Sequence, residues 1–563
     1  MRRSPSIWSD HLPDGIISTD FPENSMYEFL RERTVHALRR TAIEFEGKKT
    51  SYRTFLRHID EIAASLLFHN IKEGDIVSVI SPNIPQAVET IYAVNKIGAI
   101  ANILHPQLPS AEIRHHIENT DSRAVFILDS VYAKIEKNGW KIDPPWIILY
   151  SIADALDYPK KFLVKRTKVP CGTASPGTDR VLSWKKFLKR HVETPVSCKG
   201  EADDVALILY SGGTTGVQKG VCLTNRNINC HAVQCQEVVG CTQYARTLAV
   251  MPIFHGFGLC TTIHSELTLG SHLFLLPTYN VDKCNSLIFK KRIKIISAVP
   301  AMYEALVRSD EMRTKDCGFL KYLICGGDRM KQQTERAFNS CMEERGLPTR
   351  ILQGYGQTEC VAACMSNALF RAKEGTAGMA FSDTELKIVS TETGEEMPAG
   401  AVGELCVCGP TVMKCYYKDE EATAQALRVH ADGRTWLHTG DLFSVDEDGF
   451  YTFHGRRRRM FVVNGYNVYP EMIEKTMLRI PGIAQCCVVG IPARLGGDRI
   501  AAAVRLNDDG RDLTPRTILE TCRSLLPDYA VPYKIVILEQ FPVTGVGKVD
   551  YQRIAGEIGE GAR

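Results

Sequence analysis

Short apolar runs alternate with helical periodicity between about residues 26 and 300, and this alternation limits the possible folds most strongly. Residues 84–97 carry apolar side chains at helical spacing, between strand-like runs at 76–80 and 124–128. Strand, helix and strand in succession predict a mainly parallel α/β sheet with helices on both faces. Further strand-like runs lie at 205–209, 248–251, 273–276, 295–299 and 322–325.

The pattern changes beyond about residue 375. Strand-like runs become shorter and turns come closer together, which predicts a β-rich subdomain. After the arginine run at 456–459, the rest of the chain carries an α+β pattern of its own. We therefore expect a large N-terminal α/β domain over residues 1–455 and a small α+β domain over 456–563, with the junction near 456–459. The small domain is predicted to contain helices from 470 and over 514–526, and strands at 485–490, 500–506 and 534–538.

Bulk properties exclude several classes of protein. The length of 563 residues exceeds what one hydrophobic core usually supports, so two or more cores are expected. The net charge of +3 gives no reason to expect nucleic acid or an anionic membrane as partner. No apolar run approaches the roughly 18 residues of a membrane-spanning helix, and the N-terminus lacks the apolar core of a secretory signal. The 19 cysteines form no C-x-x-C pair and no zinc-spaced cluster, which predicts reduced core cysteines in a cytoplasmic protein.

A loop rich in glycine and hydroxyl residues follows the run at 205–209 and extends from Tyr210 to Gly220. Glycines let backbone N–H groups turn toward a phosphate, hydroxyls donate to its oxygens, and Lys219 would neutralise its charge. The Walker pattern G-x-x-x-x-G-K-S/T does not fit, since Gln218 precedes Lys219 and Gly220 follows it. The sequence therefore predicts a polyphosphate loop of another kind, with a flexible surface turn as the alternative.

Two further segments suit other parts of a nucleotide. Tyr355 lies between two glycines and can lie flat against a base, while Thr358 and Glu359 can bind phosphate and magnesium. A turn with a buried tyrosine is the alternative. Asp441, in Thr439-Gly440-Asp441, is predicted at a strand end, where a carboxylate suits the two hydroxyls of a ribose. A solvated aspartate in a turn explains the same pattern.

Three basic features remain open to two interpretations each. Lys548 ends a glycine-bordered segment at 542–548, where it can swing to a phosphate or be an exposed surface lysine. His255, after Phe254, can act as a gate or proton handler, or pack in the core. The arginine run at 456–459 suits phosphates, but no aromatic residues are interleaved with it, so nucleic-acid binding is not indicated.

In this order, the segments resemble the adenylate-forming superfamily of acyl-CoA synthetases, luciferases and adenylation domains, over residues 26–554. The superfamily's phosphate loop, S/T-S/T-G-S/T-T-G-x-P-K-G, is similar to 211–220, with Gly212 replacing a hydroxyl residue and Gln218 replacing proline. Its Y-G-x-T-E is matched in full at 355–359 and its T-G-D at 439–441. Its hinge, G-R-x-K-D/E, is similar to 455–459, where Arg459 replaces an acidic residue. Residues 464–471 resemble its continuation, and 542–548 its P-x-T-x-x-G-K.

The resemblance implies a role for each segment. Tyr355 would stack on adenine near Gly327 and Asp328, and Asp441 would take the ribose hydroxyls. Lys548 would stabilise the charge that builds as a carboxylate attacks the α-phosphorus. After the small domain rotates about the hinge, Gly465 would let a pantetheine arm approach the backbone. The catalytic residues implied are Lys548, Glu359, Thr215 and His255, with Glu359 and Thr215 at Mg²⁺. The residues implied to bind ATP or CoA are Ser211, Thr214, Thr215, Gly216, Lys219, Gly327, Asp328, Tyr355, Gly356, Thr358, Asp441, Arg456 and Gly465.

The substrate class follows from one position. Amino-acid-activating relatives place an aspartate shortly after the phenylalanine at 254, whereas this chain has His255. The apolar surroundings favour a fatty or aryl acid. The resemblance thus implies a cytoplasmic, AMP-forming ligase that uses ATP, Mg²⁺, a carboxylic acid and CoA. Loading of a carrier protein, a non-catalytic ligand-binding paralogue and a luciferase-like oxygenase remain as alternatives.

Overall fold

The computed structural model divides the chain into two compact units. One contains Met1–Leu386 with Val407–Leu437, and the other Lys387–Cys406 with His438–Arg563. The domain boundary expected at residue 455 stays a prediction. The structure describes residues 21–139, 142–157, 180–193, 195–211, 218–328, 330–459, 461–463, 466–468, 470–492, 498–526, 530–543 and 549–560.

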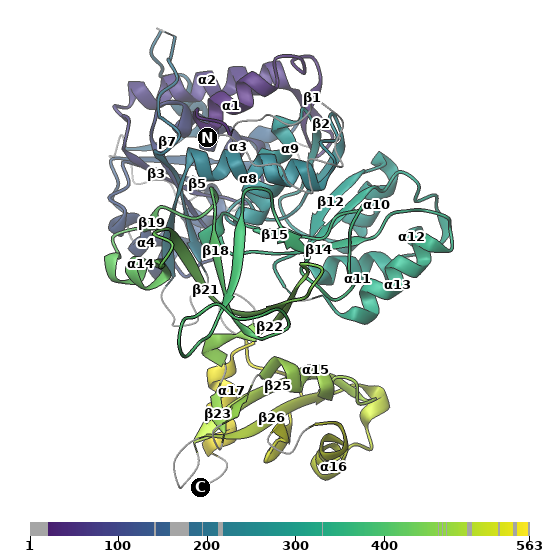
Figure 1. Ribbon diagram of the computed structural model, residues 1–563. Helices are drawn as coiled ribbons and strands as arrows, with labels where there is room; N and C mark the ends of the chain where they lie inside the picture. Colours follow the sequence, from purple (N-terminus) through teal and green to yellow (C-terminus); the bar gives the residue numbers. More distant parts are fainter. Residues whose placement is uncertain are drawn as a thin grey trace. The chain divides into compact units, whose positions relative to one another are not determined.

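The first unit contains an eight-stranded sheet in the order β19-β9-β8-β4-β3-β5-β6-β7 (Figure 1). The strands from β8 to β7 are parallel, and β9 and β19 add two antiparallel strands at one edge. The predicted runs at 76–80 and 124–128 are strands β3 and β5, buried along their whole length. The strands are β3 (Ile76–Ile80), β4 (Ile100–Leu104), β5 (Ala124–Leu128), β6 (Trp146–Tyr150), β7 (Val181–Ser183), β8 (Val205–Ser211), β9 (Lys219–Thr224) and β19 (Cys415–Tyr416).

A second sheet in the same unit has nine strands in the order β16-β15-β14-β13-β12-β10-β11-β1-β2. Its middle strands, from β14 to β1, are parallel, and antiparallel strands close both edges. The strands are β1 (Thr41–Phe45), β2 (Lys48–Ser51), β10 (Arg246–Ala249), β11 (His272–Leu275), β12 (Ile295–Ala298), β13 (Tyr322–Cys325), β14 (Ile351–Tyr355), β15 (Met365–Ser366) and β16 (Met379–Ala380).

Two helices of this unit are buried almost all round, as expected of helices inside a large core. Helix α3 (Pro85–Lys96) begins with proline at its first turn and buries every residue from Gln86 to Lys96. Helix α8 (Asn225–Val238) starts with a capping box at Thr224. The other helices of the unit include α1 (Met26–Arg33), α2 (Tyr52–Phe68), α4 (Ser110–Asn119), α5 (Asp129–Lys137), α9 (Ser265–Thr268), α10 (Val281–Lys291), α11 (Pro300–Arg308) and α13 (Gln332–Glu343).

The β-rich region expected beyond residue 375 is a sheet in the order β17-β18-β21-β20, with β22 paired to β21. Along the chain, β17, β18 and β21 each pass from one unit into the other. Short turns at 430–434 and 446–450 connect β20 to β21 and β21 to β22. The strands are β17 (Glu385–Val389), β18 (Gly403–Cys408), β20 (Leu427–Val429), β21 (Thr435–Val445) and β22 (Tyr451–Arg456).

The C-terminal part of the second unit has an apolar core of its own, which includes Ile473, Ile500 and Ile518. Its three-stranded sheet has the order β25-β26-β27, with helices beside it (Figure 1). The elements are β23 (Phe461–Val463), β24 (Tyr466–Val468), α15 (Pro470–Met477), β25 (Ile483–Pro492), β26 (Asp498–Leu506), α16 (Pro515–Leu525), β27 (Lys534–Ile537) and α17 (Tyr551–Glu560). The predicted class, parallel α/β sheets followed by a β-rich region and a small α+β part, is confirmed. Among the helices that the structure describes, none has the length and apolar content to cross a membrane.

Candidate active site

The predicted phosphate loop connects the antiparallel strands β8 and β9. Ser211, at the end of β8, is the direct partner of Lys219, at the start of β9. Both side chains are partly exposed. The hairpin therefore holds the two ends of the loop side by side. Thr214, Thr215 and Gly216, which belong to the loop itself, lie outside the described residues.

A tyrosine joins Lys219 to Glu359. The hydroxyl of Tyr416 donates a hydrogen bond of 2.7 Å to Glu359 Oε1. The Nζ atom of Lys219 lies 4.8 Å from the centre of the Tyr416 ring, a distance at which a cation is attracted to an aromatic face. Tyr416 reaches this place because β19 pairs with β9, where Tyr416 is opposite Val221. No motif in the sequence marks Tyr416, because it lies in a strand of only two residues.

The segment that carries Glu359 is fixed by an unusual turn. Val361 has φ 66° and ψ −61°, and the N–H of Ala362 donates to the carbonyl of Cys360 at 2.8 Å. This is a γ-turn of the rare, strained hand, at a buried β-branched residue. The N–H of Met413 donates to the Glu359 carbonyl at 2.8 Å. Hydrogen bonds therefore hold the backbone at Glu359 and in the turn that follows it.

Two glycines pack directly against this turn. A Cβ atom on Gly356 would lie 2.1 Å from the carbonyl oxygen of Ala362, and one on Gly256 would lie 1.8 Å from that of Val361. Neither position can accept a side chain without movement of backbone. The segment after His255 and the segment after Tyr355 therefore meet at one turn, although 100 residues separate the two glycines in the sequence.

His255 is exposed, so the alternative interpretation of the sequence, in which this histidine packs in the core, is wrong. Its Nδ1 accepts a hydrogen bond of 3.1 Å from the N–H of Phe257. Phe257 begins a π-helical segment (Phe257–His264), a helix type that is rare and common at functional sites. The neighbouring Phe254 ring lies 4.0 Å from the ring of His105. His255 is thus an accessible imidazole beside two phenylalanines.

Gly327 and Asp328 follow the carboxyl end of β13, and Tyr355 ends the next strand, β14. These strands are parallel, with Cys325 opposite Gln353. Gly327 adopts φ 80°, the left-handed region that glycine reaches without strain. The three residues therefore lie at the same edge of the sheet, which is where α/β proteins bind nucleotides. Gly327 and Asp328 are exposed, and Tyr355 is partly buried, contrary to the alternative of a fully buried tyrosine.

In the second unit, Asp441 pairs with Arg456. The two residues are direct partners across β21 and β22, and Arg456 Nε lies 3.4 Å from Asp441 Oδ1. The prediction that Asp441 ends a strand is wrong, because β21 continues to Val445. Gly440 bends the strand at this point with φ 70°. Asp441 is buried and Arg456 exposed, so the solvated turn aspartate is also excluded.

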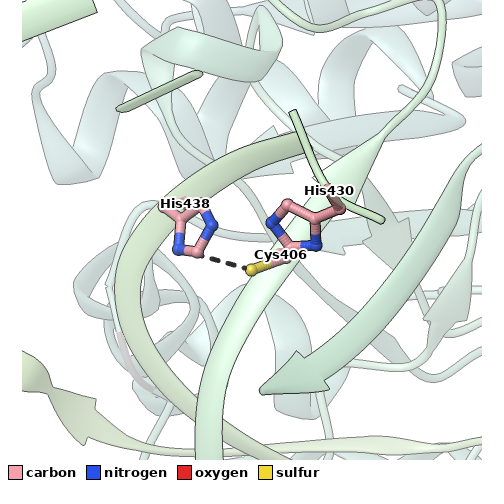
Figure 2. A group of neighbouring side chains, drawn as sticks. All are labelled: Cys406, His430 and His438. Atoms are coloured by element: carbon pink, nitrogen blue, oxygen red, sulfur yellow. Dashed lines mark hydrogen bonds between the residues drawn. The ribbon is translucent and has the colours of Figure 1, made fainter. Parts of the chain in front are cut away.

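Glu404 holds the strand around Asp441 in place. It accepts hydrogen bonds from the N–H of Gly440 at 3.0 Å and from Arg457 at 3.1 Å, and its Oε2 lies 3.2 Å from His438 Nδ1. Burial alone would raise the pKa of Glu404, but the hydrogen bond with His438 and the charges of His438 and Arg457 hold it below its ordinary value. Figure 2 shows His438 beside the thiol of Cys406, with Cys406 Sγ 3.6 Å from His438 Nδ1. The figure also draws His430.

Arg459, which replaces an acidic residue of the superfamily's hinge segment, forms ion pairs with two glutamates. Arg459 lies 2.8 Å from Glu471 and 2.6 Å from Glu474, both on α15 or at its start. Its guanidinium stacks 3.8 Å from the ring centre of Tyr551. All three charged side chains are at most 14% exposed. Lys548 and Gly465, the other predicted site residues of this part, lie outside the described residues.

Comparison with known proteins identifies the family of this chain. Residues 30–417 match the AMP-binding enzyme family, and residues 472–548 match the AMP-binding enzyme C-terminal domain. The first match alone spans more than half of the chain. The chain belongs to the AMP-binding enzyme family. It is therefore an enzyme of the adenylate-forming superfamily, as the order of its sequence segments indicated.

Relatives of this AMP-binding enzyme are similar over almost their whole length. A long-chain-fatty-acid–CoA ligase of Bacillus subtilis (strain 168) is 28% identical over 563 residues, 99% of this chain and 98% of its own. A feruloyl-CoA synthase of an Amycolatopsis species is 27% identical over 520 residues, 92% of this chain and 95% of its own. The ATP-bound crystal structure of MatB from Rhodopseudomonas palustris covers 96% of this chain and 100% of its own with a TM-score of 0.81. Its sequence identity is 22%, so this likeness shows the fold.

Proposed function

We propose that this AMP-binding enzyme joins a fatty or aryl acid to the thiol of CoA, with release of AMP and pyrophosphate. The observation that carries the proposal is the meeting of Lys219 and Glu359 on Tyr416. A cation and a carboxylate are thereby held next to the start of β9, where the glycine-rich loop ends. A bound polyphosphate requires such a cation, and its metal ion requires such a carboxylate. The names of the relatives, a fatty-acid–CoA ligase and a feruloyl-CoA synthase, support the acid classes.

The first step is the attack of the substrate carboxylate on the α-phosphorus of ATP. The carboxylate oxygen forms a bond to phosphorus, and the bond to pyrophosphate breaks. Lys219, Ser211 and the loop hydroxyls would hold the departing pyrophosphate, and Lys548 would neutralise charge at the α-phosphate. Tyr355, with Gly327 and Asp328, would hold the adenine, and Asp441 the ribose. Catalysis of this kind comes from position and charge.

The residues present fit a magnesium ion. Glu359 offers a carboxylate, the hard oxygen ligand that Mg²⁺ prefers, and Tyr416 fixes its orientation from one side. Thr215 is the second proposed ligand. When bound, the ion would neutralise charge on the phosphate oxygens during the displacement.

In the second step, the thiol of CoA attacks the acyl carbon of the acyl-adenylate and AMP leaves. We propose that the small domain, from about residue 456, turns about 456–459 between the steps and that Gly465 then borders the pantetheine arm. Arg459 is bound to α15 by two glutamates, so the turning point would lie before Arg459 rather than after it. The acid itself would lie near Phe254 and Phe257, where position 255 offers an imidazole and no carboxylate.

The test is ATP–pyrophosphate exchange with a panel of acids, including amino acids as negative controls, repeated with CoA and with a phosphopantetheine carrier protein. We expect exchange with fatty or aryl acids and formation of the CoA thioester, detected by mass spectrometry. Exchange with transfer only to the carrier protein would refute the proposed acceptor. Absence of exchange with every acid would refute the proposed formation of an acyl-adenylate. Lys548→Ala should lose at least about 100-fold in exchange, as loss of one preorganised donor does elsewhere.

A further inference from the structure

Two cysteines face each other beside the tyrosine that joins Lys219 to Glu359. Cys222 of β9 is the direct partner of Cys415 of β19 in the antiparallel pair. Cys222 is buried in a small apolar cluster, and Cys415 packs against the same cluster. The two side chains therefore point to the same face of the sheet, as opposite residues of antiparallel strands do.

The spacing of the pair suits a disulfide. Directly opposite residues in antiparallel strands have Cα atoms about 4.5–5.5 Å apart, and bonded cysteines have Cα atoms about 4.4–6.8 Å apart. Both thiols are free in the structure. Burial, and after it the neighbouring Cys415, raises the pKa of the Cys222 thiol.

The two thiols differ in access. Cys222 is 3% exposed, whereas Cys415 is partly exposed. A thiolate reacts with oxidants only where they can reach it, so Cys415 is the thiol that would react first. Cys222 is then placed to resolve the oxidised sulfur, as a second cysteine does in redox-sensing pairs.

We propose that Cys222 and Cys415 form a reversible disulfide when the protein meets hydrogen peroxide, and that this bond slows acyl-adenylate formation. The Cys415 thiolate attacks one peroxide oxygen, the O–O bond breaks, and a sulfenic acid forms with release of one water after protonation. The Cys222 thiol attacks the sulfenic sulfur, the S–O bond breaks, and the second water carries away the thiol proton. The two thiols together lose two electrons, and the peroxide gains them.

The bond acts on the site through the neighbouring residue. Tyr416 directly follows Cys415, and its hydroxyl lies 2.7 Å from Glu359 Oε1. A disulfide fixes the Cβ atoms about 3.5–4.5 Å apart and fixes the torsion about the S–S bond, so we expect its closure to constrain the backbone of β19 next to Tyr416. Hydrogen bonds weaken steeply when they are misaligned. The effect on the reaction rests on the proposed function, whereas formation of the disulfide does not.

The test uses the full-length chain, treated with hydrogen peroxide, alkylated and digested with trypsin without reduction. Cleavage after lysine and arginine places Cys222 in the peptide 220–226 and Cys415 in the peptide 415–418. We expect these two peptides to be joined after peroxide and separated after dithiothreitol. We also expect ATP–pyrophosphate exchange to fall several-fold with peroxide and to recover with dithiothreitol.

Cys415→Ser and Cys222→Ser should each abolish the joined peptide and the peroxide sensitivity of exchange. Cys198→Ser removes another partly exposed cysteine and should retain both. Cys415→Ala and Cys222→Ala serve the same purpose if a serine variant has a lowered melting temperature. Absence of the joined peptide in the parent chain would overturn the proposal. A joined peptide with unchanged exchange would overturn it equally. A chain that forms the joined peptide but shows no exchange with any acid before oxidation would refute the proposed function instead.

Discussion

Tyr416 donates a hydrogen bond of 2.7 Å to Glu359, and both residues are buried. The bond connects a two-residue strand at the edge of one sheet to the helical turn that follows a strand of the other sheet. It therefore transmits the position of β9, which begins with Lys219, to the carboxylate expected at the metal ion.

Tyr416→Phe should reduce ATP–pyrophosphate exchange by about tenfold or more, because a hydrogen bond to a charged group contributes about 1.5–3 kcal/mol. The loss should shrink at high Mg²⁺ concentration, since a bound ion would restore the orientation of Glu359. Tyr417→Phe removes a hydroxyl from the next residue, which is not bonded to Glu359, and should leave exchange within about twofold of the parent. Equal losses in the two variants would contradict the role of Tyr416.

Gly356→Ala should prevent the segment 355–363 from adopting its observed conformation. The added methyl carbon would lie 2.1 Å from the carbonyl oxygen of Ala362, and backbone would have to move. We expect loss of nucleotide binding, measured by calorimetry with ATP, together with a lowered melting temperature. Gly346→Ala is the control, since a Cβ there meets nothing within 4 Å, although its φ of 67° adds a small strain of its own. ATP affinity unchanged in Gly356→Ala would show that the turn does not position the nucleotide.

Arg459→Met should destabilise the second unit. Removing one partner of a buried ion pair typically costs about 3–5 kcal/mol, because the opposite charges stay buried without compensation. Here two glutamates, each at most 14% exposed, would be left. The control is Arg516→Met, whose partner Glu520 and own side chain are 55% and 88% exposed, and which should have almost no effect. The readout is the melting temperature, which should fall by several degrees only in Arg459→Met.

Stability should fall as the pH drops below about 6.5, in part because of His264. Burial lowers the pKa of His264 to about 3, and its two ring nitrogens are already bonded to Tyr92 and Asn229. The unfolded chain takes up a proton near pH 6.5, whereas the folded chain does not until about pH 3. The stabilisation from the neutral ring is thus complete above the unfolded pKa and lost on acidification, by about 1.4 kcal/mol per pH unit.

The measurement is urea unfolding between pH 7.5 and 5.5. His264→Asn should show a smaller loss of stability over this interval than the parent chain. His191→Asn changes an exposed histidine and should follow the parent. Parallel pH profiles for His264→Asn and the parent would exclude a contribution from His264.

The sheets could be predicted from the sequence because buried parallel strands are continuous apolar runs. The strands β3 and β5 begin and end at the predicted residues, because both are buried along their whole length and their side chains are apolar except for Ser78. The sequence predicts Asp441 at a strand end. A glycine such as Gly440 can end a strand or bend it, and here one continuous strand passes through Gly440, with φ 70°, to Val445. Local sequence cannot distinguish these two uses of a glycine.

Contacts between segments that lie far apart in the chain could not be predicted from the sequence. Tyr416 and Glu359 are 57 residues apart, and β19, which carries Tyr416, has two residues and no periodicity to recognise. The pairing of Cys222 with Cys415 depends on that same short strand. The packing of Gly256 and Gly356 against one turn likewise brings together segments that are 100 residues apart in the sequence. The order of the motifs identifies the family, whereas the neighbours that hold each motif in place are set by the tertiary fold.

The turn at Val361 has a consequence for attempts to change which acid is accepted. Gly256, Gly356 and the carbonyls of Val361 and Ala362 form one block of backbone with no room for added atoms. Mutant libraries directed at the surroundings of His255 will therefore lose most members in which either glycine is randomised, regardless of the acid tested. Diversity introduced at Phe254 and Phe257, which contribute side chains instead of close backbone, should yield a larger share of folded and selectable variants.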